Sequence, residues 1–384
     1  MHVSRRTARL AKTLLPIPIA VGIAALLLLS GCGGSAPAAD AQDLAQTTTV
    51  RVHYPGSSMF LRGDHAGLSW SKGVQLQQAG GVFTWTTTAL AARMQFKPLL
   101  ADSTWSRGPN FAVSPGATVD VWPRFRGDHG YVARYDGWWS NTLQDSRPVW
   151  IYTPPSYDEQ PDERFPIVYM HDGQNLFDAA YSFAGVIWNV QGAMDQGAAD
   201  GSVREAIVVG IGNDANRIWE YTPTDGGYGG GGASPYLDFV VGELKPQMDR
   251  TLRTSGSRLD TAIVGSSLGG LVSACAGLWH PDVFGLVGEM SPSTWWDDTW
   301  VIGQVQASAS AAVKLARVYV DSGDSGPSND DEQNTATLAQ AYQGLGIAWV
   351  QHVVGHGDSH DETAWARRLP GALRFLLGPR TAMP

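Results

Sequence analysis

The chain has 384 residues, of which only 16% are charged and 15 are tryptophan, and its formal net charge is −9. A chain of this length has room for about two domains, and its cores are large enough to need no disulfide framework. The hydrophobic fraction of 43% excludes a disordered protein, and the negative charge argues against a nucleic-acid partner, whose phosphates call for a basic surface.

Residues 1–31 have the pattern of a bacterial signal peptide. Four basic and no acidic side chains precede an apolar run over 14–29, which is short for a membrane-spanning helix. The run ends in Leu29-Ser30-Gly31-Cys32, which resembles the lipobox after which bacterial lipoproteins are cleaved and acylated. This resemblance implies a lipid anchor on Cys32 and a place in the cell envelope. Cys32 is followed by Gly33 rather than by an aspartate, which by resemblance to Gram-negative lipoproteins implies the outer membrane. The alternative is an ordinary signal peptide followed by a chance cysteine.

Cleavage before Cys32 would leave 23 basic and 36 acidic residues, a net charge of −13. The only other cysteine, Cys275, lies in the apolar segment 271–278, so we expect a buried thiol and no intramolecular disulfide. Residues 32–48 are rich in small and polar side chains without periodicity, which predicts a flexible tether.

Residues 49–128 are predicted to form a small antiparallel β-sandwich. Short alternating runs such as 50–54, 82–86 and 118–122 are separated by glycine and proline. Within this region, sequence similarity to starch-binding-type carbohydrate modules and related sandwiches is carried by the stretches 61–63, 67–70, 96–99 and 105–110.

The resemblance to carbohydrate modules implies that exposed tryptophans stack on sugar rings. The candidates are Trp70, Trp85 and Trp105. The alternative for each is packing in the sandwich core, because tryptophan is highly buried on average.

Residues 129–380 are predicted to form an α/β domain. Apolar runs that predict buried strands occur at 148–152, 167–170, 206–211, 261–264, 286–290, 318–320 and 348–354. Helix-like segments occur at 236–252, 268–278, 334–345 and 362–377. This alternation predicts a mostly parallel sheet covered by helices on both faces. The fold class is therefore α/β, preceded by the sandwich.

The segment Gly265-Ser266-Ser267-Leu268-Gly269 has the spacing G-x-S-x-G. It directly follows the strand predicted at 261–264 and precedes a helix-like segment, which is the context in which this motif presents a nucleophilic serine. Side-chain-free neighbours allow a sharp turn, and the helix N-terminus favours developing negative charge. Ser267 is the predicted nucleophile.

A serine hydroxyl needs a histidine base that an acid orients, and in this type of fold the acid precedes the histidine in the chain. Among the histidines after Ser267, we choose His360 because it lies directly before the last predicted helix. His356, in the same glycine-rich loop, is the alternative.

The acid is expected after the strand predicted at 318–320. We favour Asp324, which follows the strand end and a glycine. Asp321, Asp330 and Asp331 are the alternatives in the same loop.

Several stretches resemble the putative-esterase branch of the α/β hydrolases, which includes enterochelin esterases, feruloyl esterases and mycolyltransferases. The matching stretches are 147–157, 169–178, 220–223, 265–270, 291–293 and 360–369. The resemblance implies that Ser267 is the nucleophile, that His360 is the base, and that the backbone amides of Leu268 and Gln174 form the oxyanion hole. The sequence departs from the family pattern at the acid, because a long polar insertion follows Gly323.

These features predict a serine carboxylester hydrolase with a Ser267–Asp324–His360 triad. The sandwich favours acyl esters of carbohydrates as substrates, with siderophore ester hydrolysis, acyl transfer or non-catalytic polysaccharide binding as alternatives. No metal-ligand spacing such as H-E-x-x-H or C-x-x-C occurs, and we expect no cofactor. We expect two aromatic segments, 219–234 and 293–300, to flank the site.

Overall fold

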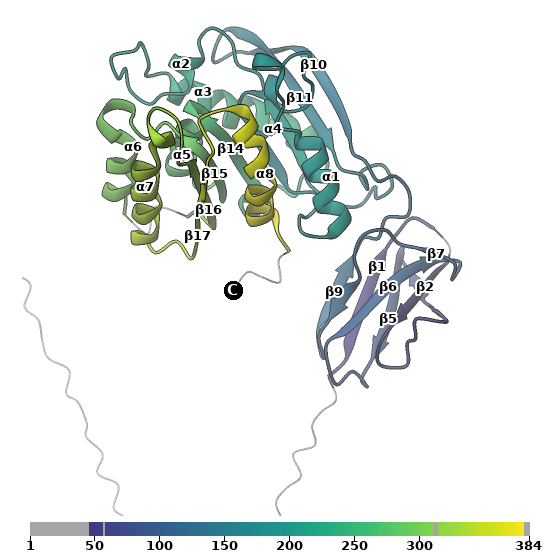
Figure 1. Ribbon diagram of the computed structural model, residues 1–384. Helices are drawn as coiled ribbons and strands as arrows, with labels where there is room; N and C mark the ends of the chain where they lie inside the picture. The colour runs from purple at the N-terminus through teal and green to yellow at the C-terminus, as the bar shows by residue number, and fades with distance from the viewer. Residues whose placement is uncertain (1–45, 57, 310–313, 380–384) are drawn as a thin grey trace, which may run out of the picture. The chain divides into compact units, whose positions relative to one another are not determined.

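The computed structural model describes residues 46–379, apart from Ser57 and residues 310–313 (Figure 1). The signal peptide, Cys32 and nearly all of the expected tether lie outside the described residues. Within the described ranges, no helix combines the length and the apolar character needed to cross a bilayer.

The first part of the described chain forms two small sheets. Its strands are β1 (Thr48–His53), β2 (Met59–Gly63), β3 (Val74–Gln75), β4 (Gln77–Ala79), β5 (Val82–Thr87), β6 (Met94–Leu100), β7 (Thr104–Trp105), β8 (Phe111–Val113) and β9 (Thr118–Val121). One sheet has the order β4-β5-β1-β9, and the other has β3-β2-β6-β7 with β8 also paired to β6. The pairs are antiparallel except that β1 and β9 run parallel.

The alternation of the sandwich strands explains its core. Val50 and Val52 of β1 are buried together with Met59 and Leu61 of β2 and with Phe96, while the residues between them are more exposed. Because side chains of a strand alternate between its faces, β1 and β2 each contribute every second residue to the core.

The second part of the chain forms one sheet of eight strands. They are β10 (Tyr131–Ser140), β11 (Asp145–Thr153), β12 (Ile167–Met170), β13 (Ile207–Ile211), β14 (Thr261–Ser267), β15 (Leu286–Pro292), β16 (Arg317–Gly323) and β17 (Trp349–Gly355). Their order is β10-β11-β13-β12-β14-β15-β16-β17. The β10–β11 hairpin joins antiparallel to β13, and all pairs from β13 to β17 are parallel.

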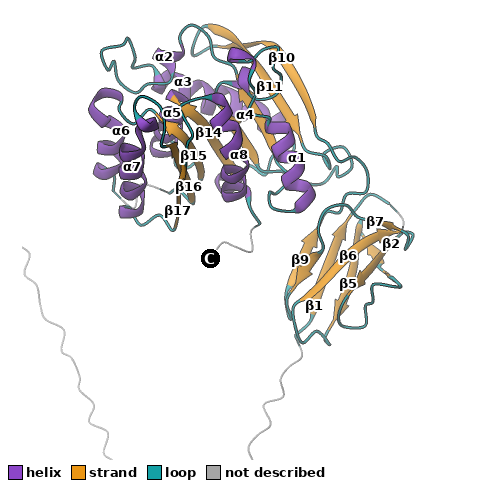
Figure 2. Cartoon of the chain, in the orientation of Figure 1, coloured by secondary structure: helices purple, strands orange, loops and turns teal. Residues whose placement is uncertain are grey.

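Helices cover this sheet on both faces (Figure 2). The longer segments are α1 (Val190–Asp200), α2 (Arg217–Glu220), α3 (Ala233–Phe239), α4 (Lys245–Thr251), α5 (Leu268–Trp279), α6 (Trp296–Ala307), α7 (Glu332–Gly344) and α8 (Glu362–Leu377), and a π-helical stretch, η3 (Val240–Leu244), joins α3 to α4. Single 3₁₀ turns are η1 (Gly173–Asn175), η2 (Phe183–Gly185), η4 (Arg258–Asp260) and η5 (Asn329–Asp331). One core contains side chains from α3 to α7, and the other contains side chains from α1 and α8. This is the α/β fold expected from the sequence.

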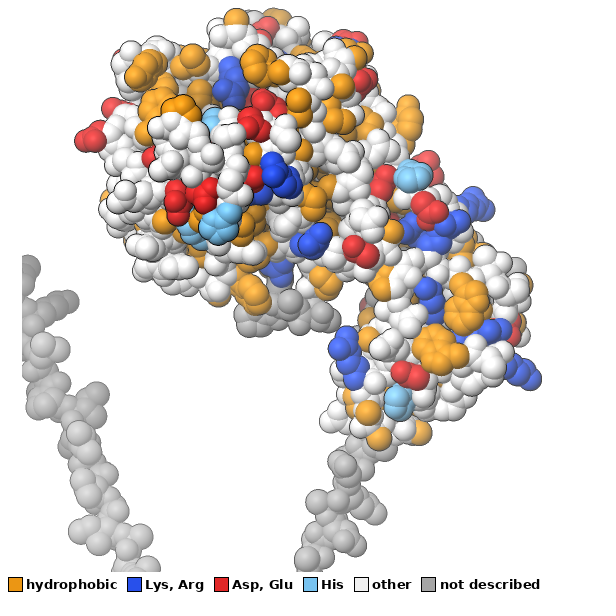
Figure 3. Space-filling view, viewed as in Figure 1, with side chains coloured by type: hydrophobic (Ala, Val, Ile, Leu, Met, Phe, Trp, Pro, Cys, Tyr) orange, Lys and Arg blue, Asp and Glu red, His pale blue; other side chains and the backbone are white. Residues whose placement is uncertain are grey.

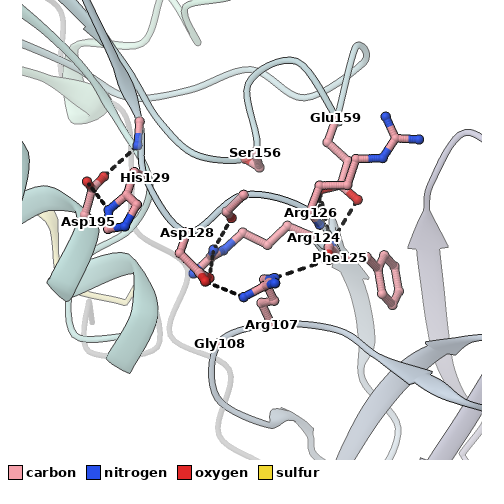
Figure 4. Close-up of polar contacts among 12 residues, drawn as sticks. Arg107, Gly108, Arg124, Phe125, Arg126, Asp128, His129, Ser156, Glu159 and Asp195 are labelled. Carbon is pink, nitrogen blue, oxygen red and sulfur yellow. Dashed lines mark hydrogen bonds and ion pairs between the residues drawn. The ribbon is translucent and has the colours of Figure 1, made fainter.

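The segment that joins the sandwich to the eight-stranded sheet, between β9 and β10, is hydrogen-bonded to the loop after β11 (Figure 4). The carboxylate of Glu159 accepts from the backbone amides of Phe125 and Arg126, at 2.9 and 3.0 Å, and from the hydroxyl of Tyr54 at 2.9 Å. Arg124 pairs with Glu205 at 3.0 Å. A carboxylate that accepts several such bonds fixes the path of the connecting segment.

The low charged fraction of the sequence is visible on the surface. Charged side chains stand among larger uncharged areas on the face shown in Figure 3. Cys275 is buried in α5, as expected, and burial raises the pKa of its thiol well above the usual range.

Candidate active site

Ser267 stands where β14 ends and α5 begins. Its backbone has φ 57° and ψ −125°, a conformation that costs a non-glycine residue free energy and that occurs mainly at functional sites. A Cβ on Gly265 would lie 2.6 Å from the backbone of Gly269, so glycine is required for the turn to close. This packing explains the glycines of the G-x-S-x-G motif.

His360 reaches Ser267 from the loop before α8. Its Nε2 lies 2.9 Å from Ser267 Oγ, and its Nδ1 lies 2.5 Å from Oδ1 of the buried Asp330. With Nδ1–H donating to the carboxylate, Nε2 is free to accept the serine proton. The structure thus brings together the serine and the histidine that the sequence analysis chose.

Asp324 does not contact His360, contrary to our expectation. It accepts from Nδ1 of His356 at 2.7 Å and from the amide of Gly357 at 2.6 Å, and these hydrogen bonds lower the pKa of its carboxyl. The chain continues past Asp324 and returns through η5, which places Asp330 under His360. The aspartate that contacts His360 is therefore Asp330, one of the open alternatives, and His356 is the partner of Asp324.

The second oxygen of Asp330 is also held. Oδ2 accepts from the hydroxyl of Ser291 and from the amide of Gly323. Burial alone would raise the pKa of Asp330, but the hydrogen bonds from His360, Ser291 and Gly323 outweigh it and lower the pKa. Asp330 is therefore an ionised carboxylate fixed at both oxygens.

Ser291 connects Asp330 to the last helix. Its Oγ accepts from Nε1 of Trp365 at 3.0 Å and from Nη2 of Arg368 at 2.7 Å. Arg368 in turn pairs with Asp321 at 3.1 Å and Asp358 at 2.7 Å. The sequence analysis assigned no role to Ser291, Trp365 or Arg368, although Ser291 opens one of the family-like stretches.

The two residues expected to supply the oxyanion hole line cavities that Ser267 also lines. Leu268 is the first residue of α5, so its amide is among those that have no acceptor within the helix, and it lines a cavity together with Ser267. Gln174 lies in η1 and lines a second cavity that also contains Ser267.

The η1 turn is fixed by an ion pair between the buried Asp172 and the partly exposed Arg217. Asp172, with a positive φ of 55°, accepts from Nε and Nη2 of Arg217, both at 2.8 Å, and from the side chain of Asn213. Burial would raise the pKa of Asp172, but Arg217 lowers it. A Cβ on Gly173 would lie 2.6 Å from the backbone of Gly210, so the turn packs directly on β13. Together these contacts hold the amide of Gln174 in place.

Ser267, His360 and Arg217 lie between two cavities. The first, of about 410 Å³, is lined by the aromatic side chains of Tyr228, Trp295 and Trp296. The three rings contact one another, with centroids 5.6 to 6.1 Å apart. Both aromatic segments that we expected to flank the site contribute to this cavity.

The second cavity, of about 460 Å³, has a more polar wall. It is lined by Asp172, Gln174, Asn175, Asn213 and Glu362, with Phe183 and Trp365 as its aromatic members. A reacting ester at Ser267 could therefore extend into two spaces of different character.

Of the three tryptophans proposed for sugar stacking, the structure brings two, Trp70 and Trp105, into contact. Trp70 and Trp105 are 38% and 40% exposed, and their ring centroids are 6.3 Å apart. The guanidinium of Arg62 lies 5.0 Å from the centre of the Trp105 ring and donates to the carbonyl of Trp70. Trp85 lies on β5 in the other sheet, where it packs against the sandwich core, which favours the core interpretation for this residue.

Comparisons with known proteins agree with this fold. The chain is 25% identical over 255 residues to an endo-1,4-β-xylanase/feruloyl esterase of Xylanibacter ruminicola, covering 63% of this chain and 31% of that protein. It is 29% identical over 208 residues to the iron(III) enterobactin esterase of Dickeya dadantii, covering 52% and 43%. The solved enterobactin esterase of Shigella flexneri has the same fold, with a TM-score of 0.51 at 18% identity over 85% of this chain and 92% of that one.

The matched regions span between 31% and 65% of the lengths of five curated relatives. Residues 140–376, more than half of the chain, match the family model described as putative esterase. This range contains Ser267, Asp330 and His360. The chain belongs to this esterase family.

Proposed function

We propose that the protein is a serine carboxylic ester hydrolase. The observation that carries the proposal is the hydrogen-bonded series Ser267 Oγ, His360 Nε2, His360 Nδ1 and Asp330 Oδ1. Membership of the esterase family and the feruloyl and enterobactin esterase relatives support it.

In the first step, Ser267 Oγ attacks the ester carbonyl and its proton passes to His360 Nε2. The carbonyl oxygen becomes an oxyanion that accepts from the amides of Leu268 and Gln174, and one such donor is typically worth about 3 kcal/mol in the transition state. The carbon–oxygen bond to the alcohol then breaks, and His360 returns the proton to the leaving alcohol. An acyl ester of Ser267 remains.

In the second step, water attacks the acyl enzyme. His360 takes a proton from the water, the bond between the acyl carbon and Ser267 Oγ breaks, and the proton returns to Ser267. Asp330 stays ionised throughout, because its lowered pKa keeps a negative charge beside the imidazolium that forms in each step.

For the substrate, we propose acyl esters of carbohydrates. The exposed pair Trp70 and Trp105 offers aromatic rings of the kind on which sugars stack. Arg62 supports this pair, because it lies over the Trp105 ring and donates to Asp102 and to the carbonyl of Trp70. The xylanase/feruloyl esterase relative supports the same substrate class. Siderophore ester hydrolysis is the second candidate, which the enterobactin esterase relative favours.

We further propose that acylated Cys32 anchors the protein to the cell envelope, with the outer membrane as its place. The basis is the order of charge, apolar run and small residues before Cys32. Two acyl chains would be sufficient for stable attachment. Mass spectrometry of the mature N-terminus tests the anchor, and an unmodified Cys32 would contradict it.

The catalytic proposal is tested with the detergent-solubilised full chain and 4-nitrophenyl butyrate. We expect Ser267→Ala to reduce hydrolysis to the background rate and to abolish labelling by a fluorophosphonate, whereas Ser103→Ala, on an exposed sandwich loop, should match the unmodified protein. Equal rates in the Ser267→Ala variant and the unmodified protein would overturn the proposal. Feruloylated arabinose and enterobactin, offered side by side, then separate the two candidate substrates.

A further inference from the structure

The charged side chains around Ser267 are mostly acidic. The described residues that line the two cavities include four carboxylates, which are Asp172, Asp330, Asp331 and Glu362. Against them, Arg217 is the only lysine or arginine in these two linings. The electrostatic character of the site therefore depends on whether Arg217 is available to a substrate.

Arg217 is already engaged by carboxylates. Its Nε and Nη2 both donate to Asp172 at 2.8 Å, in a two-pronged pair whose carboxylate is buried. Burial would lower the pKa of Arg217, but Asp172 and, less strongly, Glu362 raise it above its usual range. A bidentate pair uses the donor geometry with which arginine would hold a substrate anion. Asp172 therefore compensates most of the charge that Arg217 could offer to an anionic substrate, which would meet only the N–H groups that this pair does not use.

Within the part of the chain that the structure describes, Asp331 and Glu362 form no ion pair with a lysine or arginine. Asp331, in the aromatic cavity, accepts from the hydroxyl of Thr294 and from the side-chain amide of Asn334 at 2.9 Å, and both donors are neutral. Glu362, in the polar cavity, is the first residue of α8. Asp330 contacts His360 and lies 3.8 Å from the guanidinium of Arg368. Each cavity thus has its own carboxylate in addition to the two used by His360 and Arg217.

The aromatic wall acts in the same direction as these carboxylates. Tyr228 and Trp295 are 67% and 48% exposed, so their rings are open to a ligand. The face of an aromatic ring is the negative part of its quadrupole, so it attracts cations and repels anions. The same face can stack on an uncharged ring.

We infer that the site selects acyl esters that carry no negative charge near the reacting carbonyl, and that it discriminates against anionic esters. The inference rests on the proposed ester hydrolysis and narrows its substrate class. An uncharged aromatic acyl ester fits both the rings and the carboxylates. An iron(III) complex of catecholates is polyanionic and meets repulsion in both cavities, which favours the first candidate substrate over the second.

Three 4-nitrophenyl esters with the same leaving group and similar chain length test this. The anionic ester is the monoester of glutaric acid, the neutral one is its methyl ester, and the cationic one is 4-(trimethylammonio)butanoate. We expect kcat/KM for the neutral and cationic esters to exceed that for the anionic ester by about tenfold at low salt. Raising NaCl from about 20 mM to about 500 mM should shrink this ratio, because salt screens the repulsion, and should leave the neutral ester little changed.

Two substitutions test whether the selectivity against the anionic ester arises from the carboxylates of the cavities. Asp331→Asn and Glu362→Gln should each narrow the neutral-to-anionic ratio about threefold. Asp158→Asn is the matched control, since Asp158 is exposed in the loop after β11. Because β11 runs antiparallel to β13, this loop lies at the opposite end of the sheet from Ser267, and the control should keep the ratio of the unmodified protein.

The outcomes separate this inference from the proposed function. If none of the three esters is hydrolysed above the Ser267→Ala background, the proposed ester hydrolysis itself is wrong. If the neutral ester is hydrolysed but the anionic ester is an equal or better substrate at low salt, only the selectivity is wrong. The salt series needs no variant, so the inference stays testable if a substitution impairs folding.

Discussion

Ser291 donates its hydroxyl hydrogen to Oδ2 of Asp330, the oxygen that does not face His360. The same Ser291 oxygen accepts from Trp365 and Arg368, so it ties the acid of the site to α8. Ser291 also has a positive φ of 38°, which is rare for serine and which the surrounding contacts must hold. This relationship makes Ser291 a positioning residue that acts through Asp330.

We expect Ser291→Ala to lower kcat about tenfold to a hundredfold and to change KM little, because the substrate does not touch this side chain. Loss of the hydrogen bond should raise the pKa of Asp330, which Ser291 helps to lower. The acid limb of the kcat profile should therefore move to higher pH. A lower kcat with an unmoved acid limb would mean that Ser291 has only a structural role, and thermal unfolding of the variant is the control for its folding.

Asp330→Asn should cost about 10³- to 10⁴-fold in kcat, because an amide cannot stabilise the imidazolium and favours the wrong tautomer of His360. Asp324→Asn is the matched comparison in the same loop. It breaks only the exposed contact with His356, so its kcat should stay within about twofold of the unmodified protein. Steady-state kinetics with one ester decide between the two acids. A large loss of kcat in Asp324→Asn and a small one in Asp330→Asn would make Asp324 the acid.

The sequence could locate Ser267 and His360 but not the acid, and the reason lies in the loop after β16. Four aspartates occur between 321 and 331, and composition does not distinguish them. What selects Asp330 is a backbone path in which Asn329, Asp330 and Asp331 all have positive φ, between 49° and 55°. Such consecutive left-handed residues have no sequence signature apart from a preference for Asn and Asp.

The same contrast holds for the fold. The strands β12 to β16 are buried on both faces and were predictable as continuous apolar runs. The edge strand β10 was not predicted, because a register shift between Tyr135 and Trp138 interrupts its alternation. Helix α1 was missed as well, since Gly192 and Gly197 weaken its helical pattern, although Gly197 packs closely on Val203.

Glu289 predicts a pH dependence of stability that is separate from catalysis. It is fully buried on β15, and burial raises its pKa from 4.5 to about 8 although the hydroxyl of Tyr342 donates to it at 2.6 Å. Because the pKa is raised in the folded state, the protonated Glu289 contributes to the free energy of unfolding. This contribution is fully present below about pH 4.5 and is lost as the pH rises through about 8.

We therefore expect Glu289→Gln, which cannot ionise and keeps an acceptor for Tyr342, to be more stable than the unmodified protein at pH 9 by about a few kcal/mol. The difference should vanish near pH 4.5. Urea unfolding across this range measures it, with Asp162→Asn, an exposed carboxylate, as the control whose curve should parallel the unmodified protein. A constant offset at every pH would show that Glu289 does not titrate in this range.

The sandwich tryptophans give the last prediction. If Trp70 and Trp105 form a sugar-binding surface, Trp70→Ala and Trp105→Ala should each weaken retention on insoluble xylan or starch by about 1–3 kcal/mol in binding free energy, with little loss of thermal stability because both rings are exposed. Trp85→Ala should do the opposite, lowering Tm through lost packing against the sandwich core while leaving retention unchanged below Tm. Pull-down with the full chain and a thermal melt of each variant separate the two effects. Equal retention of the unmodified protein and the Trp70→Ala, Trp105→Ala double variant would assign these rings no role in polysaccharide binding, and the preference for carbohydrate esters would then have to come from the cavities around Ser267 alone.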